Sequence, residues 1–213
     1  MRVTIILLAA TFVLAACQPL TIQRYAISAD NNQAIKAIGA TGIGIKVFTS
    51  DADFDFHCRA VGAIQASDNV SYTQYIQKAF EDELKIAGAY ASASPRVTLG
   101  GRVNVLDFSS NVNVTRGYWQ IGITLDSSNG KSLTVNEIYE FDSGVESISA
   151  CRNTADAYSR AVQNLVGKAF KHPSFADLVL VGSPEPRPNP STEPTSTGGA
   201  PSRSTPWNWS IGR

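Results

Sequence analysis

Three consecutive segments between residues 97 and 141 alternate apolar and polar side chains, and this pattern constrains the fold more than any other. A period of two is typical of a strand with one face in the core and one in water. The apolar positions of the three segments are Val97, Leu99, Val103 and Val105; Trp119, Ile121, Ile123 and Leu125; and Leu133, Val135, Tyr139 and Phe141. The opposite, exposed face would carry Thr98, Arg102, Asn104, Tyr118, Gln120 and Thr124.

The segments between these strands have the composition of hairpin turns. Asn129 and Gly130 tolerate the positive φ values that a tight type I′ turn requires, so we predict a short hairpin there. Residues 111–117 predict a longer hairpin between the first two strands.

Two stretches have the spacing of amphipathic helices. Ser71 and Gln74 form a capping box, and Gly88 is a typical helix end, which predicts a helix over 71–87. A second helix is expected to start near Asn153 or Thr154 and to stop at Pro173. Their apolar stripes are Tyr72, Ile76, Phe80, Leu84 and Ala87, and Tyr158, Val162, Leu165 and Ala169.

A further alternating segment, Ile43 to Val47, predicts a strand ahead of the first helix. The order strand, helix, three strands, helix indicates an α+β domain over residues 41–181. We expect a two-layer sandwich in which a mostly antiparallel sheet of about four strands is covered on one face by two helices.

The N-terminus has the features of a secretory signal over residues 1–16. Arg2 precedes an apolar run, Ile5 to Val13, and small residues follow it. The run is too short to span a bilayer, which takes about 20 apolar residues. Cys17 follows this signal directly, which is typical of a lipoprotein signal. The alternative is an ordinary secretory signal in which the cysteine at this position occurs by chance.

The sequence Leu14-Ala15-Ala16-Cys17 resembles the lipobox of bacterial lipoproteins. This resemblance implies that Cys17 is lipidated, with acyl chains such as palmitate, and forms the membrane anchor. Lipoproteins kept in the inner membrane usually carry Asp after the cysteine, whereas this chain has Gln18. For a Gram-negative cell, the resemblance therefore implies the cell outer membrane, with the domain on the periplasmic face.

The segments on either side of the domain differ from it in composition. We expect residues 17–40, rich in Ala, Asn and Gln, to be a tether; the alternative is that part of this segment packs on the domain. Residues 182–213 hold seven of the ten prolines of the chain and much Ser and Thr, which predicts a disordered tail. Trp207 and Trp209 in this tail indicate a docking peptide; the alternative is a terminus with no role.

Two cysteines remain besides Cys17. An even pair in an oxidising compartment predicts a disulfide between Cys58 and Cys151. The alternative is a redox or metal-binding thiol, with His57 as a neighbouring ligand.

No pattern in the sequence indicates catalysis, a metal or a cofactor. Lysine plus arginine and aspartate plus glutamate balance, and no basic cluster indicates nucleic acid. The two histidines, His57 and His172, lie outside any catalytic motif. Asp51, Asp53 and Asp55 lack the glycine of a calcium loop, so a solvated loop is the preferred interpretation.

The order of these features resembles a known family. A lipobox, a helix ending at Gly88, long strands around Asn129-Gly130, the strand Leu133 to Phe141 and a helix ending at His172-Pro173 resemble the YajG-like family of bacterial lipoproteins. The layout is also similar to the auxiliary lipoproteins of ABC-type lipid transport systems. The resemblance implies an outer-membrane lipoprotein and supplies no catalytic residues.

We therefore expect a non-catalytic, membrane-anchored interaction module. It would bind another envelope protein through the exposed sheet face around Arg102 and Tyr118, the sheet edge or the tail. The alternative is a lipid- or ligand-binding accessory of a transport complex. That function requires a cavity lined by Phe80, Leu84, Val162 and Leu165. The sequence makes no prediction about homo-oligomers.

Overall fold

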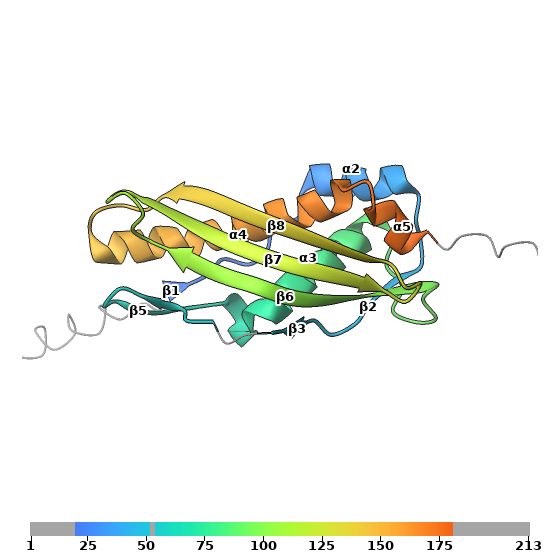
Figure 1. Cartoon of the computed structure of the whole chain (residues 1–213), viewed down its shortest axis with the longest axis horizontal. Coiled ribbons are helices and arrows are strands. Elements are labelled where there is room, and N and C mark those ends of the chain that lie inside the picture. Colours follow the sequence, from blue (N-terminus) through green and yellow to red (C-terminus); the bar gives the residue numbers. More distant parts are fainter. Residues whose placement is uncertain (1–19, 52–53, 181–213) are drawn as a thin grey trace, which may run out of the picture. The chain divides into compact units, whose positions relative to one another are not determined.

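The computed structural model of the chain describes residues 20–51 and 54–180 (Figure 1). The signal over 1–16, Cys17 and the tail over 182–213 with its two tryptophans lie outside the described residues. The helices are α2 (Ala29–Ile38), α3 (Tyr72–Ala87), α4 (Ser147–Lys171) and α5 (Phe175–Val179), with a 3-10 turn η2 (Ser67–Asn69). The strands are β1 (Leu20–Thr21), β2 (Ile43–Ile45), β3 (Thr49–Ser50), β4 (His57–Cys58), β5 (Gly62–Gln65), β6 (Val97–Ser109), β7 (Arg116–Ser127) and β8 (Ser132–Asp142).

The predicted α+β sandwich is confirmed. Strands β6, β7 and β8 form an antiparallel meander, and β2 and β3 both pair in parallel with the other edge of β6. Helices α3 and α4 lie behind this sheet in Figure 1. Trp119 from β7, Phe80 from α3 and Tyr158 from α4 are among the largest fully buried side chains between the two layers. A second small sheet, β1-β5-β4, was not predicted.

A β-bulge in β6 corrects the predicted face of Val105. The pairing with β7 shifts register between Val103 and Val105, so the next core position is Leu106, which is 5% exposed. An extra residue in one strand moves every later side chain to the other face. Val105 therefore lies opposite Gly122 on the outer side of the sheet.

The hairpin between β7 and β8 is confirmed, but its predicted turn type is wrong. Between these strands only Gly130 has a positive φ, at 84°, whereas a type I′ turn needs two such residues. The N–H of Gly130 donates to the carbonyl of Ser127 at 3.0 Å, and that of Ser127 donates to Lys131 at 2.9 Å. This is the three-residue loop in which a glycine follows a type I turn.

Helix α3 begins and ends as predicted, whereas α4 begins earlier. The capping box of Ser71 and Gln74 is formed, and Gly88 adopts a left-handed φ of 75°. Helix α4 starts at Ser147 instead of Asn153 or Thr154, because Glu146 caps it through two backbone N–H groups. Glutamate is not among the usual N-cap residues, which hid this helix start in the sequence.

The prediction that residues 17–40 form a tether is corrected for the described part of this segment. Its described part, residues 20–40, belongs to the domain: β1 pairs in parallel with β5, and α2 packs against α3 and α4. Ile22 and Ile35 are each 1% exposed. Most of α2 faces water, and its polar surface gave the segment the composition of a linker. The domain therefore extends back at least to Leu20, the first described residue, three positions after Cys17.

Candidate functional site

The outer edge of β8 is an edge of the main sheet that no described strand covers. Within the described residues, β8 pairs with β7 and with no other strand. Along an antiparallel ladder, residues alternate between bonding their neighbour and facing away. Because Ser127 bonds Lys131 and Ser143 bonds Thr115, the odd-numbered residues of β8 face β7. The backbone groups of Ser132, Thr134, Asn136, Ile138, Glu140 and Asp142 therefore face the free edge.

A groove runs between this edge and α4. It contains two hollows of about 670 and 570 Å³. The first is lined by Thr134 and Asn136 of β8, by Asn164 and Lys168 of α4, and by the start of α2. The second is lined by Tyr139 to Asp142 of β8 and by several residues of α4, including Arg160. A chain segment in the groove would thus meet backbone groups on one side and polar side chains on the other.

A buried carboxylate fixes the spacing of β8 and α4. Glu137 is 3% exposed and accepts a hydrogen bond from Asn164 at 3.2 Å, and Lys168 forms an ion pair with its other oxygen. The Lys168 ammonium also donates to the carbonyl of Asn136 at 3.3 Å. Lys168 therefore occupies one outward carbonyl of the edge, and its ion pair with Glu137 joins α4 to β8.

The exposed-face residues Arg102 and Tyr118 do not form one patch. Arg102 pairs with Thr124, whereas Tyr118 pairs with Ser109 near the far end of β6. At about 3.4 Å per residue, the two side chains are roughly 20 Å apart along the sheet. Each has its own acidic neighbour: Asp51 lies 3.5 Å from Arg102. Tyr118 donates to Asp107 at 3.0 Å, and this hydrogen bond raises the pKa of Tyr118.

The four side chains that a ligand cavity would require are core residues. Phe80, Leu84, Val162 and Leu165 are fully buried and belong to the common hydrophobic cluster. They therefore pack within the core between helices and sheet instead of lining an opening to solvent.

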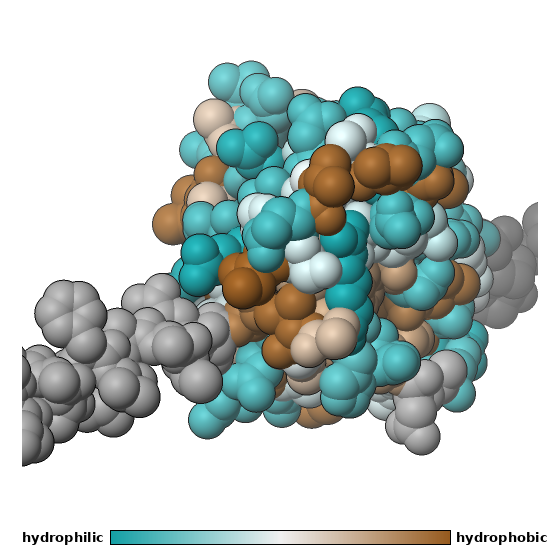
Figure 2. All heavy atoms as spheres, turned by 90° about the vertical axis from the view of Figure 1, so that its left-hand side faces the viewer, coloured by the Kyte–Doolittle hydropathy of each residue, from teal (hydrophilic) through white to brown (hydrophobic). Residues whose placement is uncertain are grey.

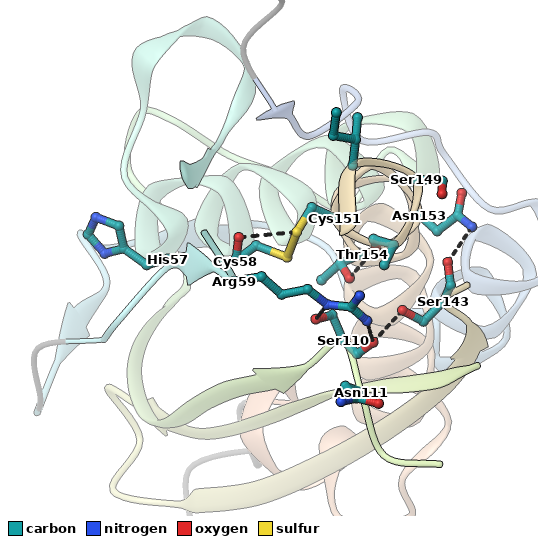
Figure 3. Close-up of a disulfide and its surroundings, with 12 residues drawn as sticks. His57, Cys58, Arg59, Ser110, Asn111, Ser143, Ser149, Cys151, Asn153 and Thr154 are labelled. Atoms are coloured by element: carbon teal, nitrogen blue, oxygen red, sulfur yellow. Dashed lines mark hydrogen bonds between the residues drawn. A yellow bond between two sulfur atoms is a disulfide. The ribbon is translucent and has the colours of Figure 1, made fainter. Parts of the chain in front are cut away.

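The structure contains the predicted disulfide between Cys58 and Cys151, with 5.7 Å between the Cα atoms and both residues fully buried (Figure 3). Beside it, Arg59 donates to the backbone carbonyl of Ser110 at 2.7 Å and to that of Val145 at 3.1 Å. The bond and the guanidinium together fasten the β4–β5 turn to the loops before β7 and before α4. Sequence reasoning missed Arg59, whose donors reach backbone atoms that carry no sequence signal.

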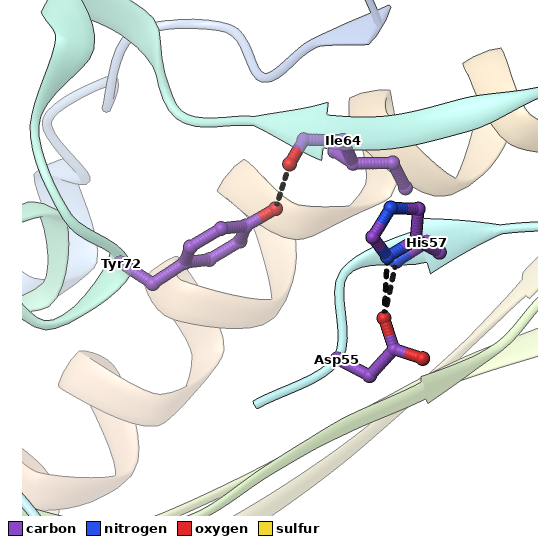
Figure 4. Close-up of polar contacts among 4 residues, drawn as sticks. All are labelled: Asp55, His57, Ile64 and Tyr72. Atoms are coloured by element: carbon purple, nitrogen blue, oxygen red, sulfur yellow. Dashed lines mark hydrogen bonds and ion pairs between the residues drawn. The ribbon is translucent and has the colours of Figure 1, made fainter. Parts of the chain in front are cut away.

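The acidic loop around Asp55 holds a solvent-exposed pair. The His57 ring lies 2.8 Å from the Asp55 carboxylate, and the backbone N–H and ring of His57 lower the pKa of Asp55 (Figure 4). Asp53 lies outside the described residues. Among the residues that the structure describes, no three His, Cys, Asp or Glu side chains are grouped as a metal site would require.

Near this loop, the Tyr72 hydroxyl donates to the carbonyl of Ile64 at 2.8 Å.

A second buried carboxylate joins α2 to the core. One oxygen of the fully buried Glu83 accepts hydrogen bonds from the Tyr25 hydroxyl at 2.7 Å, the Ser28 N–H at 2.8 Å and the Asn31 amide at 3.3 Å. The sequence contained one indication that Glu83 is buried: it lies three residues after Phe80, on the apolar stripe of α3.

We expect the stability contributed by Glu146 to depend on pH. The backbone N–H and hydroxyl of Ser149, with the N–H of Ile148, lower the pKa of Glu146 to about 2. A lowered folded-state pKa stabilises the fold at neutral pH, and this contribution is lost as the pH falls from the ordinary value of 4.5 towards 2. Urea unfolding should show E146Q less stable than the wild type at pH 6, with the difference shrinking by pH 3. A difference that stays constant with pH would contradict this role of the charge.

Val114 occupies a backbone conformation that valine rarely adopts. Its φ is 66°, a left-handed value that is unfavourable for β-branched side chains and tolerated by asparagine. We expect V114N to raise the free energy of unfolding by about 1 kcal/mol. V112N is the matched control: Val112 is not among the described residues with positive φ, so its change should lie within about 0.5 kcal/mol. Equal effects in chemical denaturation would show that the backbone conformation is not the cause.

Among the described residues, no helix combines the length and the apolar character needed to cross a membrane.

Comparison with known proteins yields similarity only at the level of three-dimensional structure. No protein-family model and no curated protein matches the chain. A candidate lipoprotein from Caulobacter crescentus is 13% identical over 70% of this chain and 97% of its own, with a TM-score of 0.41. A protein of the DUF330 family from Xanthomonas campestris is 9% identical over 70% of this chain and 93% of its own, with a TM-score of 0.40. Similarity at this level assigns neither a family nor a function to the chain.

Proposed function

We propose that this chain is a non-enzymatic envelope lipoprotein that is anchored through Cys17 and binds an extended segment of another envelope protein along the free edge of β8. The membrane concerned is the outer membrane, and the domain faces the periplasm. The edge of β8 is the observation that carries the binding proposal.

An open edge of this length supports strand addition. Added strands gain main-chain hydrogen bonds from the edge and specificity from neighbouring side chains. Here six residues of β8 turn their backbone groups outward, and the groove beside α4 supplies polar side chains such as Asn164 and Arg160. Proteins usually protect such an edge with charges or a cover. Here the charged group is Lys168, whose ammonium donates a hydrogen bond to the outward carbonyl of Asn136.

The tail supplies a second route to the same class of partner. Trp207 and Trp209 would act as docking side chains at the end of a proline-rich segment. The two routes differ in one measurable respect, because a form truncated after Gly182 keeps the edge and loses both tryptophans.

In-cell photo-crosslinking tests the edge directly. A photoreactive residue at Thr134, which is exposed beside the groove, should capture one envelope protein, whereas the same residue at Ile86, 59% exposed on α3, should not. I138P removes one outward N–H without touching the bonds to β7 and should abolish the adduct. I138T keeps that N–H and should preserve it.

Four outcomes would count against the proposal. An adduct of equal yield from Ile86, or one insensitive to I138P, would place the contact elsewhere. Loss of the adduct on truncation after Gly182 would make the tail the docking element. An N-terminal peptide without acyl chains at Cys17, measured by mass spectrometry, would remove the anchor.

A further inference from the structure

Four large aliphatic side chains are exposed together at one end of the domain. Val112 and Val114 lie in the loop between β6 and β7, Val145 lies in the loop between β8 and α4, and Ile148 lies in the first turn of α4. Their exposed fractions are 48%, 63%, 68% and 49%. Figure 2 views the domain from this end, and brown hydrophobic residues stand out there among hydrophilic ones.

These loops are fixed to each other. The N–H of Ser143 donates to the carbonyl of Thr115 at 2.7 Å, and the Ser143 hydroxyl donates to the carbonyl of Ser110. Arg59 bonds the backbone of both loops, and the buried disulfide lies beside it (Figure 3). The exposed side chains therefore stand on a rigid base, and their exposure does not arise from a loose loop.

The first described residue lies at the same end. Leu20 pairs with Ile64 of β5, and Gly62 at the start of β5 pairs with Cys58, next to Arg59. Two residues lie between Cys17 and Leu20, and the three residue steps that join them span at most about 11 Å when fully extended. A lipid on Cys17 thus brings the bilayer surface to this end of the domain.

The backbone at Val114 is a second, independent observation. A β-branched residue at a φ of 66° is unfavourable, yet the Val114 side chain is 63% exposed and contributes little to the core. An apolar side chain is thus kept at a position where asparagine would fit the backbone better. Internal packing does not account for this choice, whereas contact with an apolar surface outside the domain does.

We propose that this apolar end, defined by Val112, Val114, Val145 and Ile148, rests on the lipid bilayer and holds the domain upright on it. The proposal rests on the lipid anchor at Cys17. Aliphatic side chains enter the boundary between headgroups and acyl chains, where they gain from burial. Arg116 at this end is paired with Glu140 and Asp142, so its charge is balanced within the domain. The strands of the sheet then point away from the membrane, and the groove beside β8 stays open along its length.

The experiment compares two valines of similar exposure in the acylated, full-length protein. V145C places a label at the apolar end, and V47C places it between β2 and β3, at a valine that is 75% exposed. Cys58 and Cys151 are bonded and buried, so they do not react. Each variant is labelled with an environment-sensitive fluorophore and reconstituted into phosphatidylethanolamine–phosphatidylglycerol vesicles, with or without lipids that carry a nitroxide near the headgroup.

The expected result is a blue-shifted emission at position 145 and a several-fold stronger quenching by the nitroxide lipids than at position 47. Equal quenching at both positions, with Cys17 shown by mass spectrometry to be acylated, overturns the docking proposal and leaves the anchor intact. A blue shift at 145 without quenching, lost on dilution of protein in lipid, identifies a second copy of the chain as the occupant and also overturns it. An unacylated Cys17 overturns both the anchor and the docking proposal.

Discussion

Replacing Cys58 and Cys151 together by alanine is expected to lower the free energy of unfolding by about 4–5 kcal/mol. The bond joins residues separated by 93 positions, so its loss frees a long loop in the unfolded chain. For a domain of this size, each kcal/mol corresponds to about 2–4 °C in Tm, which predicts a fall of roughly 10–20 °C. Thermal unfolding followed by circular dichroism measures this directly.

The control is the wild-type protein unfolded with and without a reducing agent. Because the bond is fully buried, we expect it to resist reduction in the native state, so that reductant changes unfolding only once the chain opens. A loss below about 1 kcal/mol in the double variant would show that the unfolded chain keeps the two segments close without the bond.

E83A is expected to lower the free energy of unfolding by about 3 kcal/mol. The change removes the acceptor shared by the Tyr25 hydroxyl, the Ser28 N–H and the Asn31 amide, while these donors stay buried or half-buried. The damage should be concentrated in α2, which these bonds hold against α3. Hydrogen exchange should therefore accelerate most over Ala29–Ile38.

Two variants control for this effect. D82A removes a neighbouring carboxylate that forms an ion pair with Lys78 on the surface of α3, and it should cost less than about 1 kcal/mol. E83Q keeps an oxygen acceptor but places an amide donor where the second carboxylate oxygen has no hydrogen-bond partner, so its effect should be intermediate. An equal loss in E83A and D82A would contradict a specific role for the buried group.

Local periodicity correctly predicted the helices and strands in which the apolar positions follow the buried face. The alternation in β7 and β8 and the capping box of α3 agree with the structure because each depends on neighbours a few residues away. The bulge at Val105 depends instead on the register with β7. The side chain of Val105 gives no sign of the shift, since either face of a strand accepts valine.

The rest of the site depends on long-range contacts between polar groups. Helix α2 was missed because it buries only Asn31 and Ile35, too few to produce an apolar stripe. Glu83 and Arg59 hold segments together through hydrogen bonds to distant backbone and side-chain atoms. That β8 has a free edge could be predicted, because it is the last strand of a meander. The sequence could not show which of its backbone groups face outward.

The contacts of the N-terminal segment also tie its folding to that of α4, near the other end of the domain. Gln23 bonds Asp156, and Gln163 bonds the carbonyl of Ala26, at sequence separations of 133 and 137. These residues therefore find their partners only after α4 has been made. If Cys17 is acylated before the domain folds, these contacts form while that end of the chain is already held at the membrane.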